Sequence, residues 1–419
     1  MPKTKGEIKK IKIDENASII RMVDNLFNYA IVQEAESILL EPKEDSLDVS
    51  FSFYGNFHPV VNIAKKLELE IIRKIKDIAG LDAQKNNLPQ FGEFKIGLSS
   101  SRVVFSVSVR STTKGEKIII DINKEESRLL HLKELGFQRS ALCLVKKNLE
   151  KGNGGIIIIG DFDSGKTTTL YSFLGLVSSP EINITTIERE ISHDLPFINQ
   201  SLLNIKSGFD HSFAIPSLLR QDPDVVMIDE VNNRKTAEDF FLIAERGHLA
   251  LASIYGRNIS TCLSFFKELG IPLSLFIRTA NLVVSQKLVK RICPYCVSEQ
   301  KMSQTMASKI KKSFDISSLI KKAKKKRSIS AHVKKLEDMS FYKSKGCNRC
   351  NNTGFIGRIG VFEVLEISEK VGELINSGHL LKIRNEIDNQ EEFYLEEDAF
   401  LKAVSGATSI DEALRIADR

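Results

Sequence analysis

The loop between residues 160 and 167 has the residue types and spacing of a phosphate-binding site. It fits the pattern G-x-x-x-x-G-K-[ST], follows an apolar run at 156–159 and opens a helix-like stretch. In such a loop, backbone N–H groups and the helix N-terminus surround phosphates, the lysine neutralises their charge, and the threonine hydroxyl ligates Mg²⁺. The sequence therefore predicts a site for ATP and Mg²⁺; the alternative is a strand-to-helix turn without a ligand. The residues expected to surround the nucleotide are Gly160, Asp163, Ser164, Gly165, Lys166, Thr167 and Thr168.

A pair of carboxylates, Asp229 and Glu230, follows a second apolar run at 225–228. This is the Walker B pattern, so we expect a strand that lies beside the phosphate-loop strand in a parallel sheet. Both carboxylates then emerge at the carboxyl edge of the sheet, where α/β folds bind ligands. We therefore expect them to belong to the nucleotide site.

Two C-x2-C pairs are set beside turn residues, which is typical of a tetrahedral Zn²⁺ site. The alternative is four unrelated buried thiols. The expected ligands are Cys293, Cys296, Cys347 and Cys350. The other two cysteines, Cys143 and Cys262, lie in apolar helical patterns, and we expect both in the core.

The segment between the cysteine pairs contains a basic run at 321–327, "KKAKKKR". We interpret this segment as a solvated loop that projects from the zinc-binding module. Binding of the run to anionic lipid or nucleic acid is an alternative.

Apolar periodicity predicts the elements that position these residues. Residues 17–122 combine a helix, a short strand, two alternating strand-like stretches and helical spacing over 60–82, which predicts an α/β domain. Residues 125–151 are expected to be helical. Beyond them, strand-like and helix-like stretches alternate, and this alternation predicts a parallel sheet.

Composition places the chain among ordinary globular proteins, with 419 residues, 42% hydrophobic content and a net charge of +6. There is no apolar run of membrane-spanning length, and the charged first residues do not resemble a signal peptide. We therefore expect a cytoplasmic protein, in which paired cysteines favour metal over disulfides.

With these residues in view, the chain resembles the motor ATPases of type II secretion and type IV pilus assembly over about residues 17–419. The motifs that carry the resemblance are "LRQDPDVVM", "RGHLALAS", "QKLVKRICPYC", "GCNRCNNTGFIGRIGVFEVL" and, near the start, "ESILLEP" and "LPQFGEF". The resemblance implies an ATP hydrolase that forms a hexamer and acts on an inner-membrane platform protein at the inner face of the membrane. Nucleic acid is not an expected partner.

The resemblance also implies roles for single residues. Glu230 would orient the attacking water, and Glu188 would support the metal or the water. His248 would sense the γ-phosphate region. Arg220 and Arg110 match arginines that reach the nucleotide.

Several positions depart from the family pattern. The loop contains Asp161, Phe162 and Asp163, so two carboxylates lie beside a polyphosphate, and nucleotide binding weakens unless Asp163 points away. Three other departures concern groups that the family uses in the site, and they put hydrolysis in doubt more than the fold; they are Ser192, Pro216 and Tyr255. The family's additional N-terminal helical domain is not expected in this chain.

We therefore predict an α/β protein with a RecA-like P-loop core. The expected divisions are a tail at 1–16, an N-terminal α/β domain at 17–122, the ATPase domain at 123–285, a zinc-binding element at 286–362 and a helical tail at 363–419. The alternatives are a nucleotide-gated scaffold with little hydrolysis and a DNA-translocating P-loop ATPase. The sequence does not distinguish pilus assembly from protein secretion or DNA uptake.

Overall fold

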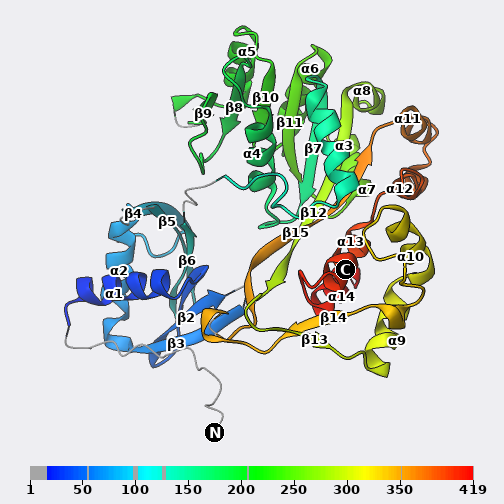
Figure 1. Ribbon diagram of the computed structural model, residues 1–419. Helices are drawn as coiled ribbons and strands as arrows, with labels where there is room; N and C mark the ends of the chain where they lie inside the picture. The colour runs from blue at the N-terminus through cyan, green and yellow to red at the C-terminus, as the bar shows by residue number, and fades with distance from the viewer. Residues whose placement is uncertain are drawn as a thin grey trace. The chain divides into compact units, whose positions relative to one another are not determined.

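The computed structural model describes residues 17–53, 56–97, 102–124, 129–204, 207–350 and 352–418 (Figure 1). The chain forms two compact units, Met1–Arg128 and Leu129–Arg419. The predicted tail at 1–16 lies outside the described residues. Among the helices that the structure describes, none has the length and apolar character needed to cross a membrane.

The first unit is an antiparallel six-stranded sheet with two helices, α1 (Ile19–Val32) and α2 (Glu68–Ile78). The strand order is β3-β2-β1-β6-β5-β4. The predicted helix over 60–82 is wrong at its start, because residues 61–64 pair with β2 and α2 begins only at Glu68. The strands are β1 (Ser37–Pro42), β2 (Ser46–Phe53), β3 (Asn56–Ala64), β4 (Gln90–Gly97), β5 (Arg102–Thr112) and β6 (Gly115–Lys124).

The second unit is built on a seven-stranded sheet in the order β15-β12-β7-β11-β10-β8-β9. Six strands run parallel, and β15 pairs with β12 in the antiparallel direction. The mixed α/β fold with a parallel sheet is therefore confirmed. The strands are β7 (Gly154–Gly160), β8 (Ile184–Glu188), β9 (Ile198–Leu202), β10 (Val225–Ile228), β11 (Leu249–Tyr255), β12 (Ala280–Ile292) and β15 (Phe355–Glu366).

Helices cover both faces of this sheet. Ile156 and Ile158 of β7 pack in a core with α3 (Arg139–Glu150) and α4 (Lys166–Val177). Ile157 and Ile159 point to the opposite face and its second core. The helices of that second face are α5 (His211–Leu219), α6 (Arg234–Glu245), α7 (Ile259–Glu268), α8 (Leu273–Thr279), α11 (Glu369–Asn376) and α12 (Leu380–Asn389).

Two sequence predictions about this unit are wrong. β10 does not lie beside β7, because β11 pairs in parallel with both and separates them. Six of the seven β11 residues are buried, as a central strand requires. The helix predicted over 125–151 is also too long: residues 125–128 lie outside the described residues, and α3 begins only at Arg139.

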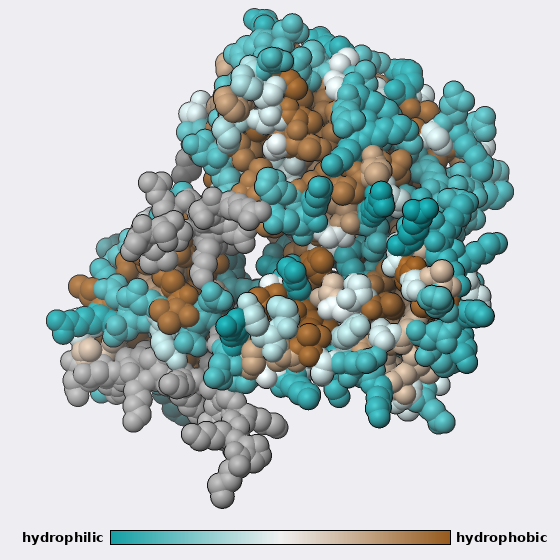
Figure 2. Space-filling model, in the orientation of Figure 1, coloured by the Kyte–Doolittle hydropathy of each residue, from teal (hydrophilic) through white to brown (hydrophobic). Residues whose placement is uncertain are grey.

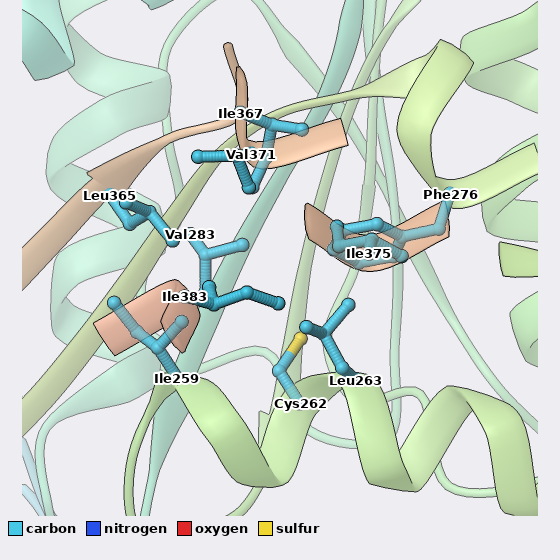
Figure 3. Close-up of a pocket in the computed structure, with 10 residues that line it drawn as sticks. All are labelled: Ile259, Cys262, Leu263, Phe276, Val283, Leu365, Ile367, Val371, Ile375 and Ile383. Atoms are coloured by element: carbon cyan, nitrogen blue, oxygen red, sulfur yellow. The ribbon is translucent and has the colours of Figure 1, made fainter. Parts of the chain in front are cut away.

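An apolar region beneath α7 belongs to the core and not to a ligand site. Figure 3 shows Cys262 and Leu263 of α7 facing Ile375, Ile383 and other aliphatic side chains from α11, α12 and the sheet. All ten side chains that line this region are apolar, so it offers no group that would orient a ligand. Cys262 is buried as predicted, whereas Cys143 is exposed because α3 turns Ala141 and Val145 inward instead.

The segment between the cysteine pairs is folded, which corrects the prediction of a projecting solvated loop. It contains β13 (Val297–Gln300), α9 (Gln304–Ser313), α10 (Ile316–Lys325) and β14 (Phe341–Ser344). The apolar face of α10 packs in a core with two C-terminal helices, α13 (Leu395–Val404) and α14 (Ile410–Ala417). In Figure 2 the surface over α10, α11 and α12 is mostly hydrophilic.

Acids of the C-terminal region neutralise much of the basic run. Lys322 contacts Asp388 and lies 2.7 Å from Glu397, while Lys326 lies 3.2 Å from Glu392. These lysines therefore pair with acids of α12, α13 and the segment between them in their own chain.

Glu363 of β15 is a fully buried carboxylate. One oxygen accepts the N–H of Leu395 at 3.3 Å, and the other has no partner among the described residues. Burial raises the pKa of Glu363 from 4.5 to about 7. The folded state therefore retains a proton that the unfolded chain releases.

Glu363→Gln tests this consequence. Between pH 4.5 and about 7 the wild-type free energy of unfolding should fall as pH rises, because the folded state binds the extra proton. The variant should lose this slope and be more stable at pH 8 by up to about 3 kcal/mol, as measured by urea unfolding. Glu373→Gln on the exposed side of α11 is the control, and equal slopes in all three proteins would contradict the assignment.

Candidate nucleotide-binding site and metal centre

The phosphate loop joins the end of β7 to the first residue of α4, Lys166. Gly165 takes a left-handed φ of +84°, and a Cβ on Gly160 would lie 2.1 Å from the Ser164 hydroxyl, so both positions require glycine. Lys166 Nζ donates to the carbonyl oxygens of Gly160 and Asp161, each at 2.9 Å. Burial lowers the pKa of Lys166, and the charge of Glu230 opposes that shift. The lysine therefore lies within the loop and close to the Walker B acid.

Asp163 lies in the same loop with a left-handed φ of +57°, a backbone shape that Asp accepts more readily than most residues. Its exposed carboxylate forms an ion pair with Arg358 of β15. The side chain is thus bound to a cation outside the loop.

The Walker B carboxylates follow β10 at the carboxyl edge of the sheet, as the sequence predicts. Asp229 accepts the backbone N–H groups of Arg189, at 2.8 Å, and Glu230, at 2.6 Å. Burial raises the pKa of Asp229, and these two hydrogen bonds oppose the shift. Glu230 is partly exposed, and its carboxylate lies 3.4 Å from the Arg189 guanidinium.

Glu188 ends β8 at the same edge, but its carboxylate is already bound. It is fully buried and accepts hydrogen bonds from the Tyr171 hydroxyl, from Thr186 and, at 3.1 Å, from Gln200. Burial, together with the carboxylate, raises the pKa of Tyr171. The same hydroxyl accepts the Ser192 N–H at 3.2 Å. Glu188 therefore links the phosphate-loop helix to the sheet edge.

Two predicted site residues of this unit, His248 and Arg220, do not lie at the end of β7 where the phosphate loop begins. His248 precedes β11, and its backbone carbonyl accepts the N–H of Gly154 at the amino end of β7. The seven residues of β11 separate it by about 20 Å from the carboxyl edge, so within one chain the structure does not bring His248 to the phosphate loop. Tyr255 ends the same strand and pairs with Gly160. Arg220 is exposed at the end of α5, just before the amino end of β10.

Arg110 lies on β5 of the first unit and is exposed. It is therefore accessible on the surface of its own unit.

Three residues near the loop were missed in the sequence. Gln286 of β12 is buried, and its Nε2 donates to the Ser164 carbonyl at 2.8 Å. Arg358 and Arg189 pair with site carboxylates as described above. Gln286 and Arg358 stand within motifs quoted for the family resemblance, but spacing alone did not place them at the loop.

The four predicted zinc ligands meet at one point. Their Sγ atoms lie within 4.8 Å of one another, and the nearest pairs are 3.7 to 3.8 Å apart. A tetrahedral site with Zn–S bonds of about 2.3 Å requires sulfur atoms about 3.8 Å apart, so the cluster fits the ion. The N–H groups of Cys347 and Gly354 donate to the Cys350 sulfur at 3.2 and 3.3 Å. Backbone hydrogen bonding lowers the pKa of Cys347 to about 7, whereas burial raises the pKa of Cys293 and of Cys296, so among these three thiols only that of Cys347 favours the thiolate that binds metal.

Residues 12–415 match the model of the type II/IV secretion system protein family. The chain is 29% identical over 417 residues to the type IV pilus assembly ATPase PilB of Myxococcus xanthus, covering 98% of this chain and 70% of the relative. It is 27% identical over 405 residues to the type II secretion system protein E of Aeromonas hydrophila, covering 96% of this chain and 76% of the relative.

Solved structures share the fold. The Yersinia pseudotuberculosis ATPase DotB superposes with a TM-score of 0.65 at 16% identity, covering 100% of this chain and 99% of the other. The pilus retraction motor PilT with bound ADP superposes with a TM-score of 0.57 at 16% identity, covering 94% and 96%.

Cys347→Ser tests the metal centre. We expect about one Zn²⁺ per chain in the purified wild type and a loss of most of it in the variant, because four thiolates complete the tetrahedron. Metal analysis and thermal unfolding measure the two effects, and Cys143→Ser is the matched control with an exposed thiol. A wild type without zinc, or a Cys347→Ser variant with unchanged zinc and stability, would refute the site.

Proposed function

Since this chain belongs to the family of type II/IV secretion system proteins, we propose that it is a motor ATPase that powers secretion or pilus assembly. The observation that supports this best is the meeting of the phosphate loop with two Walker B carboxylates at one edge of a parallel sheet. This is where α/β folds bind their ligands.

In this proposal each site residue has a separate task. Lys166 turns from the loop carbonyls to the phosphates of ATP, and Glu230 orients the attacking water. Thr167 and Asp229 would hold Mg²⁺, which would neutralise phosphate charge. Gln286 of β12 holds the loop backbone through its hydrogen bond to the Ser164 carbonyl. Glu188 acts indirectly, because its oxygens hold Tyr171 and the end of β8.

We further propose a homo-hexamer in which ATP closes neighbouring domains and hydrolysis reopens them. Arg220 and Arg110 are exposed and would reach a nucleotide held by another domain or subunit. The first unit, within 17–122, would act as the moving N-terminal domain on the ATPase core. The moving assembly would act on a platform protein at the inner face of the membrane.

A nucleotide-gated scaffold with little hydrolysis is the second candidate. Two observations favour slow turnover: the Glu188 carboxylate is fully engaged by protein groups, and Tyr255 ends the strand next to the loop where the family pattern has a histidine. Loss of one well-placed electrostatic group typically slows a reaction by about 10²–10³-fold. Binding of ATP would survive such losses.

The first experiment compares ATP binding with phosphate release in the wild type, Lys166→Ala and Glu230→Gln. We expect Lys166→Ala to lose binding, and Glu230→Gln to bind ATP while releasing phosphate at least about 10²-fold more slowly than wild type. Glu238→Gln, an exposed acid on α6, is the control. If the wild type binds ATP but releases phosphate no faster than Glu230→Gln, the chain is a scaffold. If the wild type binds no ATP, both candidates are wrong.

The second experiment measures mass by light scattering with Mg²⁺ and a non-hydrolysable ATP analogue. We expect a hexamer, and we expect Arg220→Ala to lower nucleotide-dependent assembly because the exposed guanidinium would contact a neighbour's nucleotide. Arg246→Ala, exposed after α6, is the control. A wild type that stays monomeric at micromolar concentration under all nucleotide conditions would contradict the ring.

A further inference from the structure

Two neighbouring side chains of the phosphate loop have partners on opposite sides of it. The Phe162 ring, 90% exposed, lies 6.0 Å from the Tyr255 ring at the end of β11. The next side chain, that of Asp163, contacts the opposite flank, where it pairs with Arg358 of β15. Because β11 adjoins β7 on one side, and β12 and β15 follow on the other, the two contacts straddle the loop.

The ion pair between Asp163 and Arg358 reduces the repulsion expected between the Asp163 carboxylate and a bound phosphate. A carboxylate beside a polyphosphate repels it, and the repulsion grows as their separation shortens. Arg358 places a permanent positive charge against the Asp163 carboxylate. The pair as a whole is close to neutral, so the loop no longer presents that carboxylate to an anionic ligand.

We propose that Arg358 is a positioning residue for the nucleotide: it holds the Asp163 carboxylate aside and cancels its charge, so that this loop accepts a polyphosphate. The inference rests on the proposed function, since it assumes that the loop binds ATP. It assigns Arg358 an action through Asp163 and not through a contact with phosphate. On the opposite flank the exposed Phe162 ring lies 6.0 Å from the Tyr255 ring, so no contact that the structure describes there draws the Asp163 carboxylate back toward the loop.

A double-mutant cycle tests the mechanism by binding alone. The probe is a fluorescent non-hydrolysable ATP analogue with Mg²⁺. Arg358→Gln should weaken binding about tenfold, because it leaves Asp163 uncompensated. In a protein that already carries Asp163→Asn, Arg358→Gln should weaken binding of the analogue less than about threefold. Arg358→Lys should retain much of the affinity because it keeps the positive charge.

Arg291→Gln, which removes an exposed cation from neighbouring β12, is the matched control and should leave binding unchanged. If Arg358→Gln weakens binding equally with and without Asp163, Arg358 acts on the phosphate or the fold directly, and the inference is wrong. It is also wrong if Arg358→Gln has no effect.

A second measurement needs no nucleotide. Hydrogen exchange of the loop amides at 160–165 should become about two- to fivefold faster in Arg358→Gln and in Asp163→Asn, with no further increase in the double variant. Unchanged or additive rates would refute the pairing. If the wild type binds no ATP, the proposed function fails, yet this exchange measurement still decides whether the pair holds the loop.

Discussion

The burial of β7 on both faces is the constraint on which the second unit depends. Alternate isoleucines of this strand enter two separate cores, so helices must cover both sides of the sheet. Two-sided burial favours parallel strands joined through helices, and parallel strands deliver their carboxyl ends to one edge. The phosphate loop, Glu188 and the Walker B pair meet there for that reason. The chemistry of the site is thus a consequence of how the apolar strands are packed.

Sequence periodicity predicted the α/β class and the apolar strands that precede the phosphate loop and the Walker B pair, but it could not order the strands. Nothing local in residues 225–228 shows that β11 separates β10 from β7, because strand pairing depends on residues far apart in the chain. The sequence does show, however, at which end of a strand a neighbouring residue lies. A residue before a strand lies at its amino end, so His248 lies at the amino end of β11, whereas Tyr255, the last residue of the strand, lies at its carboxyl end.

Partners of charged groups were the other feature that sequence could not supply. The run at 321–327 has the composition of a solvated surface, yet Lys322 and Lys326 contact acids more than 60 residues later in the chain. The hydrogen-bond partners of Glu188 could not be read from the sequence either. A carboxylate at a catalytic edge suggests chemistry, but Tyr171 and Gln200 occupy its oxygens. Burial and hydrogen bonding, which spacing does not encode, separate a reactive carboxylate from a structural one.

Phe162 and Asp163, the unusual residues of the loop, can be explained only together with the side chains that they contact. An aspartate beside a phosphate site, or an exposed phenylalanine at its tip, breaks a local rule when it is considered alone. In the structure each has a complementary group within reach, Arg358 for the carboxylate and Tyr255 for the ring. In a sequence that specifies one structure, each residue must suit the groups that surround it in the fold. It follows that departures from a family motif are better judged by their contacts than by the motif alone.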